Sequence, residues 1–257
     1  MQPGLLIISH GSREAGWVAL VDRTVEAVRS ALGNEMAVEA AFLELVEGRL
    51  IQDGVSRLEA SGVNRMLALP LFVSSGSTHV DEIGWALGAY AEARTETELA
   101  RVEVKAKLTY GAPMDDDPEI VDVLLDRLQE LSVNAGEESL LLIGHGSKEP
   151  GFKEAWESGM ASIGRQLIER GGFGDCLGAL LQLDEVAEKF GELRERHAGH
   201  AVIAVPLFLS EGYFTSIVIP RELSGMECRY SGRTYMPHPR IAEWIVRKAK
   251  EWQLNDG

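Results

Sequence analysis

One stretch of this sequence occurs twice. Residues 4–17 read GLLIISHGSREAGW, and residues 139–152 read SLLLIGHGSKEPGF. Each copy is a short apolar run that ends on His-Gly-Ser and leads into an amphipathic segment. This pattern is typical of a buried strand joined by a tight turn to a helix. The repetition indicates that the chain of 257 residues contains the same structural unit twice.

Apolar runs alternate with helix-period patterns along both halves. In the first half we expect strands at 4–9, 36–45, 66–73 and 102–110, and helices at 14–32, 48–62, 79–93 and 117–132. In the second half we expect strands at 139–144, 176–183, 201–210 and 228–235, and helices near 153–170, 184–196 and 240–252. This alternation predicts an α/β fold with a parallel sheet, covered by helices, in each half.

Four pairs of landmark residues recur at nearly constant offsets. They are His10 and His145, Pro70 and Pro206, Tyr110 and Tyr235, and Pro118 and Pro239. We therefore expect two tandem domains, 1–133 and 134–257, divided within a polar linker at 132–139. The two strands that contain Pro70 and Pro206 should end near these prolines, because proline has no N–H to give to a neighbouring strand.

Composition limits the classes of partner. The chain has 25 Lys and Arg against 40 Asp and Glu, a formal net charge of −15, which excludes a nucleic-acid partner as a first choice. No apolar run approaches the length of a membrane span, and the N-terminal run lacks the basic residues of a signal peptide. Two cysteines without a CxxC motif favour a reducing compartment. We expect a cytoplasmic protein, and a monomer, because an internal duplication can replace a dimer.

Three side chains should meet at one edge of the first sheet. Ligands of such folds bind beyond the carboxyl ends of the strands. The first strand leads to His10 and Ser12, and the second to Glu44. The third leads to the segment SSGSTHVDE, with Ser75, His79, Asp81 and Glu82. Imidazole nitrogen together with carboxylate oxygen suits divalent iron, cobalt, nickel or zinc, and also suits proton transfer. A simpler interpretation stays open, in which His10 and His79 are ordinary loop and helix-start residues and Glu44 is a solvated strand end.

The second half serves as a comparison within the molecule. His145 keeps the position of His10, but Gln182 aligns with Glu44, and either Phe214 or Thr215 aligns with His79. This half should therefore carry a partly degenerate site.

The motifs LLIISHGSR, FLEL and LPLFVSSGSTHVDEI resemble those of the class II tetrapyrrole chelatases, in particular the sirohydrochlorin chelatases of CbiX type. The resemblance covers residues 4 to 250 and implies two flavodoxin-like domains, as in the long members of the family. It implies that His10 and His79 bind the metal and that Glu44 is the acidic partner.

The activity implied by this resemblance is insertion of a divalent metal into a tetrapyrrole, in cobalamin or siroheme biosynthesis. Cobalt is the first expectation, then iron, with nickel open. The metal is a substrate, and no organic cofactor is expected. Sirohydrochlorin is a polycarboxylate, so Arg13 and Lys148, with Ser12 and Ser75, are candidates to bind it. Arg13 and Lys148 equally fit solvated helix starts.

Two other functions compete with metal insertion. A non-catalytic metal- or tetrapyrrole-binding protein would use the same histidines. A histidine phosphatase also places His-Gly after its first strand, but needs an arginine before the histidine to hold phosphate. Ser9 and Gly144 occupy those positions here. The sequence leaves open the physiological metal, the pathway and the role of His145.

Overall fold

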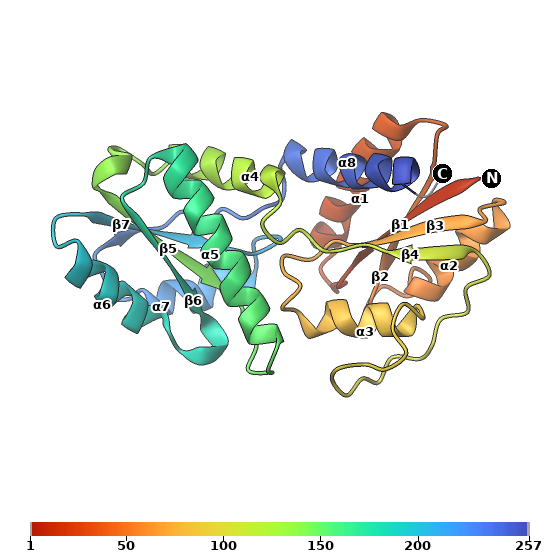
Figure 1. The fold of residues 1–257 in the computed structure, drawn as a ribbon, viewed down its shortest axis with the longest axis horizontal. Helices are drawn as coiled ribbons and strands as arrows, with labels where there is room; N and C mark the ends of the chain where they lie inside the picture. The colour runs from red at the N-terminus through yellow and green to blue at the C-terminus, as the bar shows by residue number, and fades with distance from the viewer. Residues whose placement is uncertain (1, 256–257) are drawn as a thin grey trace. The chain divides into compact units, whose positions relative to one another are not determined.

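The protein, seen in a computed structural model that describes residues 2–255, contains two parallel four-stranded sheets (Figure 1). The elements of the first repeat are β1 (Pro3–Ser9), α1 (Ala15–Leu32), β2 (Ala37–Phe42), α2 (Ile51–Ala60), β3 (Arg65–Pro70), α3 (Thr78–Ala86), β4 (Lys107–Tyr110) and α4 (Pro118–Gln129). Its strands lie in the order β2-β1-β3-β4. This confirms the predicted α/β class for the first half.

The second repeat follows the same order after a 3₁₀ turn, Ala135–Glu137. Its elements are β5 (Glu138–Gly144), α5 (Phe152–Gly171), β6 (Asp175–Leu180), a 3₁₀ turn (Leu181–Leu183), α6 (Val186–Arg196), β7 (Ala201–Pro206), a π-helical turn (Phe214–Val218), α7 (Ile219–Glu222), β8 (Cys228–Arg229) and α8 (Pro239–Asn255). The strand order β6-β5-β7-β8 repeats that of the first sheet. The predicted duplication of the fold is thus confirmed.

Both prolines end their strands, as predicted. Pro70 pairs with Ile8 as the last residue of β3, and Pro206 pairs with Ile143 as the last residue of β7. In each sheet the next residue, Leu71 or Leu207, donates its backbone N–H back to the first strand. The polar residues after each proline are thereby delivered to the carboxyl edge of the sheet.

The central strands are buried on both faces. Leu5 to Ile8 of β1 are fully buried. Leu6 and Ile8 belong to a cluster with residues of α2 and α3, such as Val55 and Ile83. In Figure 1, α2 and α3 lie on one side of this sheet and α1 with α8 on the other. Continuous apolar strands, instead of alternating ones, are required by this double covering.

The compact units of the structure do not coincide with the sequence repeats. One unit comprises Met1–Met114 with Pro239–Gly257, and the other comprises Asp115–His238. Helix α8 packs against α1, and α4 packs against α5, so the last helix of each repeat belongs to the unit of the other repeat. Trp252 of α8 is buried there and donates its indole N–H to Thr109, 3.0 Å away. The predicted boundary at 133/134 follows the repeats and misses this exchange, because periodicity does not reveal which sheet an apolar helix face covers.

Several predicted elements are shorter than expected. The strand predicted at 228–235 pairs only at Cys228 and Arg229. Two further cases in the first repeat have a visible cause. The helix predicted at 79–93 ends at Ala86, because Gly88 has a φ of 80° and the N–H of Ala89 turns back to the carbonyl of Gly84. The strand predicted at 102–110 pairs only over Lys107–Tyr110. Its first part alternates as predicted, but side chains satisfy its N–H groups: Glu103 bonds to Gln52, and Lys105 to Glu59.

The counterpart of Tyr110 is Tyr230, and the predicted pairing with Tyr235 is wrong. Tyr110 donates its hydroxyl to the carbonyl of Val80, and Tyr230 donates to that of Thr215, both at 2.7 Å. Tyr235 is instead fully buried. Among residues 2–255, none of the helices has the length and apolar composition needed to cross a bilayer.

Candidate functional site

The turn after β1 holds His10 against the loop that carries Glu44. The N–H of Glu44 donates to the carbonyl of His10 at 3.0 Å. Gly11 follows with a φ of 105°, and a Cβ there would lie 1.9 Å from the carbonyl oxygen of Glu44. Only glycine fits this close approach of two backbones. The glycine of the His-Gly-Ser motif is therefore what lets the first and second strand ends meet.

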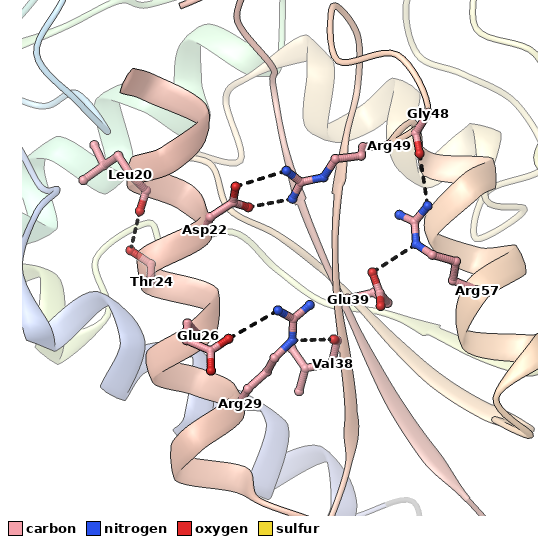
Figure 2. Close-up of polar contacts among 10 residues, drawn as sticks. All are labelled: Leu20, Asp22, Thr24, Glu26, Arg29, Val38, Glu39, Gly48, Arg49 and Arg57. Atoms are coloured by element: carbon pink, nitrogen blue, oxygen red, sulfur yellow. Dashed lines mark hydrogen bonds and ion pairs between the residues drawn. The ribbon is translucent and has the colours of Figure 1, made fainter. Parts of the chain in front are cut away.

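An ion pair and a hydrogen bond hold the loop that carries Glu44 through its residues Gly48 and Arg49 (Figure 2). Arg49 reaches Asp22 on α1 with two hydrogen bonds, at 2.6 and 3.1 Å, and its guanidinium lies over the Phe42 ring. The hydrogen bond to Asp22 raises the pKa of Arg49. Arg57 of α2 donates to the carbonyl of Gly48 at 3.1 Å (Figure 2). The loop that carries Glu44 is thus fastened to both flanking helices.

The structure brings His10 and His79 together, as the sequence predicts. Their ring centroids are 4.8 Å apart with 78° between the ring planes. His79 lies in the first turn of α3, and Phe72 packs beside it at 6.3 Å between centroids. Glu44 Oε1 lies 3.7 Å from His10 Nδ1. The side chains of His10, His79 and Glu44 are 39%, 43% and 52% exposed, so all three are accessible to a ligand.

Both imidazoles are anchored through the same nitrogen. His10 Nδ1 lies 3.1 Å from the carbonyl oxygen of Gly11, and His79 Nδ1 lies 2.5 Å from Glu82 Oε1. Carbonyl and carboxylate oxygens only accept, so Nδ1 carries the proton in each bond. The lone pair of each ring is then on Nε2. Metal-binding histidines are typically held in this way, with the second nitrogen donating to a carbonyl or carboxylate.

Glu82 is a residue that the sequence places at this edge of the sheet but to which the sequence assigns no role. It accepts from His79 through one oxygen and from the Thr97 hydroxyl, at 2.8 Å, through the other. Burial raises the pKa of this carboxyl. The hydrogen bonds from His79 and Thr97 together lower the pKa by more than burial raises it, so the net shift is downward. The signal was its spacing of three residues from His79 on a helix, which places both on one face.

The histidine pair does not form a closed metal site. Within residues 2–255, no three side chains of His, Cys, Asp and Glu are arranged to hold one ion together. Two imidazoles alone would leave most coordination positions of a divalent ion open. An open coordination sphere is the property of a site where a ligand exchanges, whereas structural sites are closed.

The other predicted binding residues lie at a helix start or at the surface. Ser12 accepts the N–H of Glu14 at 3.0 Å, which gives it a local role at the helix start. Arg13 and Ser75 are exposed in one unit, and Lys148 is exposed in the other. Their part in binding a substrate stays a prediction.

The second unit repeats the backbone of this site with other side chains. The N–H of Gln182 donates to the carbonyl of His145 at 3.0 Å, and His145 Nδ1 lies 3.2 Å from the carbonyl of Gly146. Phe214 takes the position of His79: its ring lies 5.0 Å from that of His145, at 88°. Thr215, the other candidate, is buried and bonds to Gly212.

The chain is similar in sequence to two named chelatases. The chain is 22% identical to the sirohydrochlorin ferrochelatase of Bacillus subtilis over 263 residues, which cover 99% of this chain and 94% of that protein. It is 27% identical to the sirohydrochlorin cobaltochelatase of Methanopyrus kandleri over 137 residues, which cover 49% of this chain and 94% of that protein.

A structure of SirB from Bacillus subtilis with Fe3+ has the same fold. The TM-score is 0.76 at 22% identity, and the match covers 100% of this chain and 97% of that one. The family model CbiX matches residues 4–131 and 139–252, so that both sequence repeats fall within it. The chain therefore belongs to the CbiX family.

Proposed function

We propose that this chain is a sirohydrochlorin chelatase, which inserts a divalent metal ion into the tetrapyrrole as a lyase. Cobalt is our first choice of metal and iron the second, with nickel not distinguished by the ligand chemistry. One observation carries the proposal. The ring centroids of His10 and His79 lie 4.8 Å apart, each ring is anchored through Nδ1, and the carboxylate of Glu44 lies beside His10. The names of the relatives in Bacillus subtilis and Methanopyrus kandleri support it.

The two histidines receive the metal substrate. Neutral imidazoles bind a borderline divalent ion moderately, and they compete with protons for it, so an ion held this way can also be released. Because the pair supplies only two nitrogens, the remaining positions are available to water and then to the nitrogens of the macrocycle. Positioning ion and macrocycle together replaces a bimolecular encounter by a local transfer.

Glu44 is placed to handle protons. Insertion releases two protons from the pyrrole nitrogens, and they need an acceptor close to the metal. The Glu44 carboxylate lies 3.7 Å from His10 and is half exposed. It can accept a proton and return it to solvent. We therefore assign His10 and His79 to the metal and Glu44 to proton acceptance.

The remaining parts of the proposal concern partners and location. The tetrapyrrole carboxylates would be met by Arg13, Lys148, Ser12 and Ser75. We propose that the chain acts as a monomer in the cytoplasm, because it holds the repeat twice and uses few cysteines. We propose no nucleic-acid or membrane partner, given the net charge of −15.

The test is incubation of the protein with sirohydrochlorin and Co2+, Fe2+ or Ni2+ in turn, followed by the absorbance change of metal insertion. We expect the wild type to exceed the reaction without protein, and Glu44→Gln to bind metal but insert it slowly. His79→Ala should lose metal binding and insertion together. Metal binding without any acceleration of insertion would identify a carrier protein and reject the chelatase assignment.

A further inference from the structure

The connection from α3 to β4 differs sharply from its counterpart in the second repeat. In the first repeat it comprises residues 87–106, whereas the connection from α7 to β8 comprises only residues 223–227. Long connections without secondary structure are uncommon in compact domains, where they are either functional or linker segments. The longer one occurs in the repeat that has the histidine pair. We call residues 87–106 the strap.

The strap is bonded to α3 along the length of that helix. The N–H of Arg94 donates to Asp81, and the hydroxyl of Thr97 donates to Glu82. Further along, Arg101 donates to the carbonyl of Trp85, and the N–H of Val102 donates to the carbonyl of Ala86. The guanidinium of Arg101 also lies 4.1 Å from the centre of the Trp85 ring. Asp81, which accepts the N–H of Arg94 at 2.8 Å, is 5% exposed. These bonds fix the helix that presents His79.

One of these bonds connects the strap to His79 through Glu82. The Thr97 hydroxyl accepts the N–H of Leu99 at 3.1 Å and donates to Glu82 at 2.8 Å. Glu82 in turn accepts from His79 Nδ1 at 2.5 Å. We propose that the strap is a positioning element of the metal site, which acts through Thr97 and Glu82 to fix the tautomer and orientation of the His79 ring. This inference rests on the proposed role of His79 as a metal ligand.

The two hydrogen bonds of Glu82, from Thr97 and from His79, have a clear physical effect on the His79 ring. A free imidazole exchanges between two tautomers and rotates about its side-chain bonds. A carboxylate that accepts from Nδ1 places the lone pair on Nε2 and makes that nitrogen a better ligand. Thr97 occupies the other oxygen of the carboxylate, so the Glu82 side chain, which is 17% exposed, is held in one orientation. Ile217 occupies the place of Glu82 in the second repeat, three residues after Phe214.

The strap has attachments that do not involve the histidine. Glu59 of α2 accepts the N–H groups of Lys105 and Ala106 at 2.6 and 3.0 Å. The partly buried apolar residues Leu99, Val102, Val104 and Ala106 pack on the core of this unit. Loss of the Thr97 hydroxyl should therefore leave the strap in place, while it frees Glu82. Substitutions at Thr97 can therefore test the positioning of His79 without unfolding the strap, and a substitution at Glu59 serves as the matched control.

The experiment measures Co2+ binding to the full chain without tetrapyrrole, by titration followed in the visible absorption of the bound ion. Glu82→Gln should weaken binding about 10- to 100-fold, because an amide offers only one acceptor to two donors. Thr97→Val should weaken it roughly 5-fold, the effect of one hydrogen bond, and Thr97→Ser should restore it. Glu59→Ala, which loosens the strap elsewhere, should bind like the wild type. Nitrogen NMR of His79 should show the Nδ1–H tautomer in the wild type and a mixture in Glu82→Gln.

The outcomes separate this inference from the proposed function. If His79→Ala abolishes Co2+ binding while Glu82→Gln and Thr97→Val bind as tightly as the wild type, the strap does not position the ligand and the inference is wrong. If Glu59→Ala weakens binding as much as Thr97→Val, the strap acts by general packing, and the inference is also wrong. If His79→Ala binds Co2+ normally, the proposed function itself fails.

Discussion

Phe214 meets His145 edge to face, as His79 meets His10. The ring centroids are 5.0 and 4.8 Å apart, and the planes cross at 88° and 78°. The two repeats thus keep one backbone geometry at the rim and differ in the side chains that it presents. The two units therefore differ at this edge in their side chains and not in their fold.

The first prediction is that two substitutions restore a metal site in the second unit. Phe214→His with Ile217→Glu recreates the His79–Glu82 pair beside His145. Both positions are exposed, by 36% and 55%, so no charge is buried. Equilibrium dialysis with Co2+ should show a second bound ion per chain. It should bind more weakly than the first, since residues 223–227 provide no counterpart of Thr97. An unchanged stoichiometry would show that the side chains alone do not distinguish the rims.

The second prediction compares the two equivalent histidines. His10→Ala should slow metal insertion at least about 100-fold, because it removes a ligand outright, a larger change than the loss of a partner of a ligand. His145→Ala should stay within about 3-fold of the wild type, since Phe214 and Gln182 leave it without metal-binding neighbours. Initial insertion rates at saturating tetrapyrrole measure both. An inactive His145→Ala beside an active His10→Ala would place the reaction in the second unit.

The third prediction concerns the glycine of the first turn. Gly11→Ala places a methyl group against the carbonyl of Glu44 and a side chain at a φ of 105°. It should lower the free energy of unfolding by about 2–4 kcal/mol and displace the Glu44 loop. Gly16→Ala is the matched control, because nothing lies within 4 Å of the new methyl group. It should be neutral or slightly stabilising, as alanine favours a helix. Urea unfolding of both variants decides the matter.

The fourth prediction is an acid-sensitive contact at Glu138. Burial opposes ionisation of this carboxyl, but bonds from Ser132, the backbone N–H groups of Val133 and Asn134, and Arg229 lower its pKa to about 2. A folded-state pKa below the unfolded value stabilises the fold above about pH 4.5, and this contribution disappears as the pH falls towards 2.

Glu138→Gln should therefore cost about 3 kcal/mol at pH 7. The variant should lose less stability than the wild type between pH 5 and pH 3, the upper part of the range set by a pKa near 2. Denaturant unfolding at several pH values measures this. Parallel curves for the two proteins across this range would show that Glu138 is not the titrating group.

The sequence predicts most of the fold because its periodicity is strong. The apolar runs before His10 and His145 are strands, and Pro70 and Pro206 end theirs as expected. The convergence of His10, Glu44 and His79 follows from parallel topology alone, since all three come after strands of one sheet. The order of strands and helices along the chain is enough to place these three residues at the same edge.

What the sequence does not predict depends on contacts between distant segments. Thr97 is fifteen residues from Glu82 in a stretch without periodicity, so its hydrogen bond leaves no local signal. Tyr230 was missed because the shorter connection before β8 shifts the offset between the repeats. The positions of α4 and α8 were missed because an amphipathic helix shows that one face is buried but not by which sheet.

The exchange of α4 and α8 makes the assembly of each sheet independent of protein concentration. In a polypeptide with a single repeat, the last helix would not pack on the sheet of that repeat. A second molecule would have to supply the helix that covers this sheet. Joining both repeats in one chain turns that second-order event into an intramolecular one. A cut after residue 133 would separate α8 from Met1–Met114, the segment that holds Thr109, the hydrogen-bond partner of the buried Trp252. We expect the two fragments to fold only when mixed, and their activity to depend on dilution.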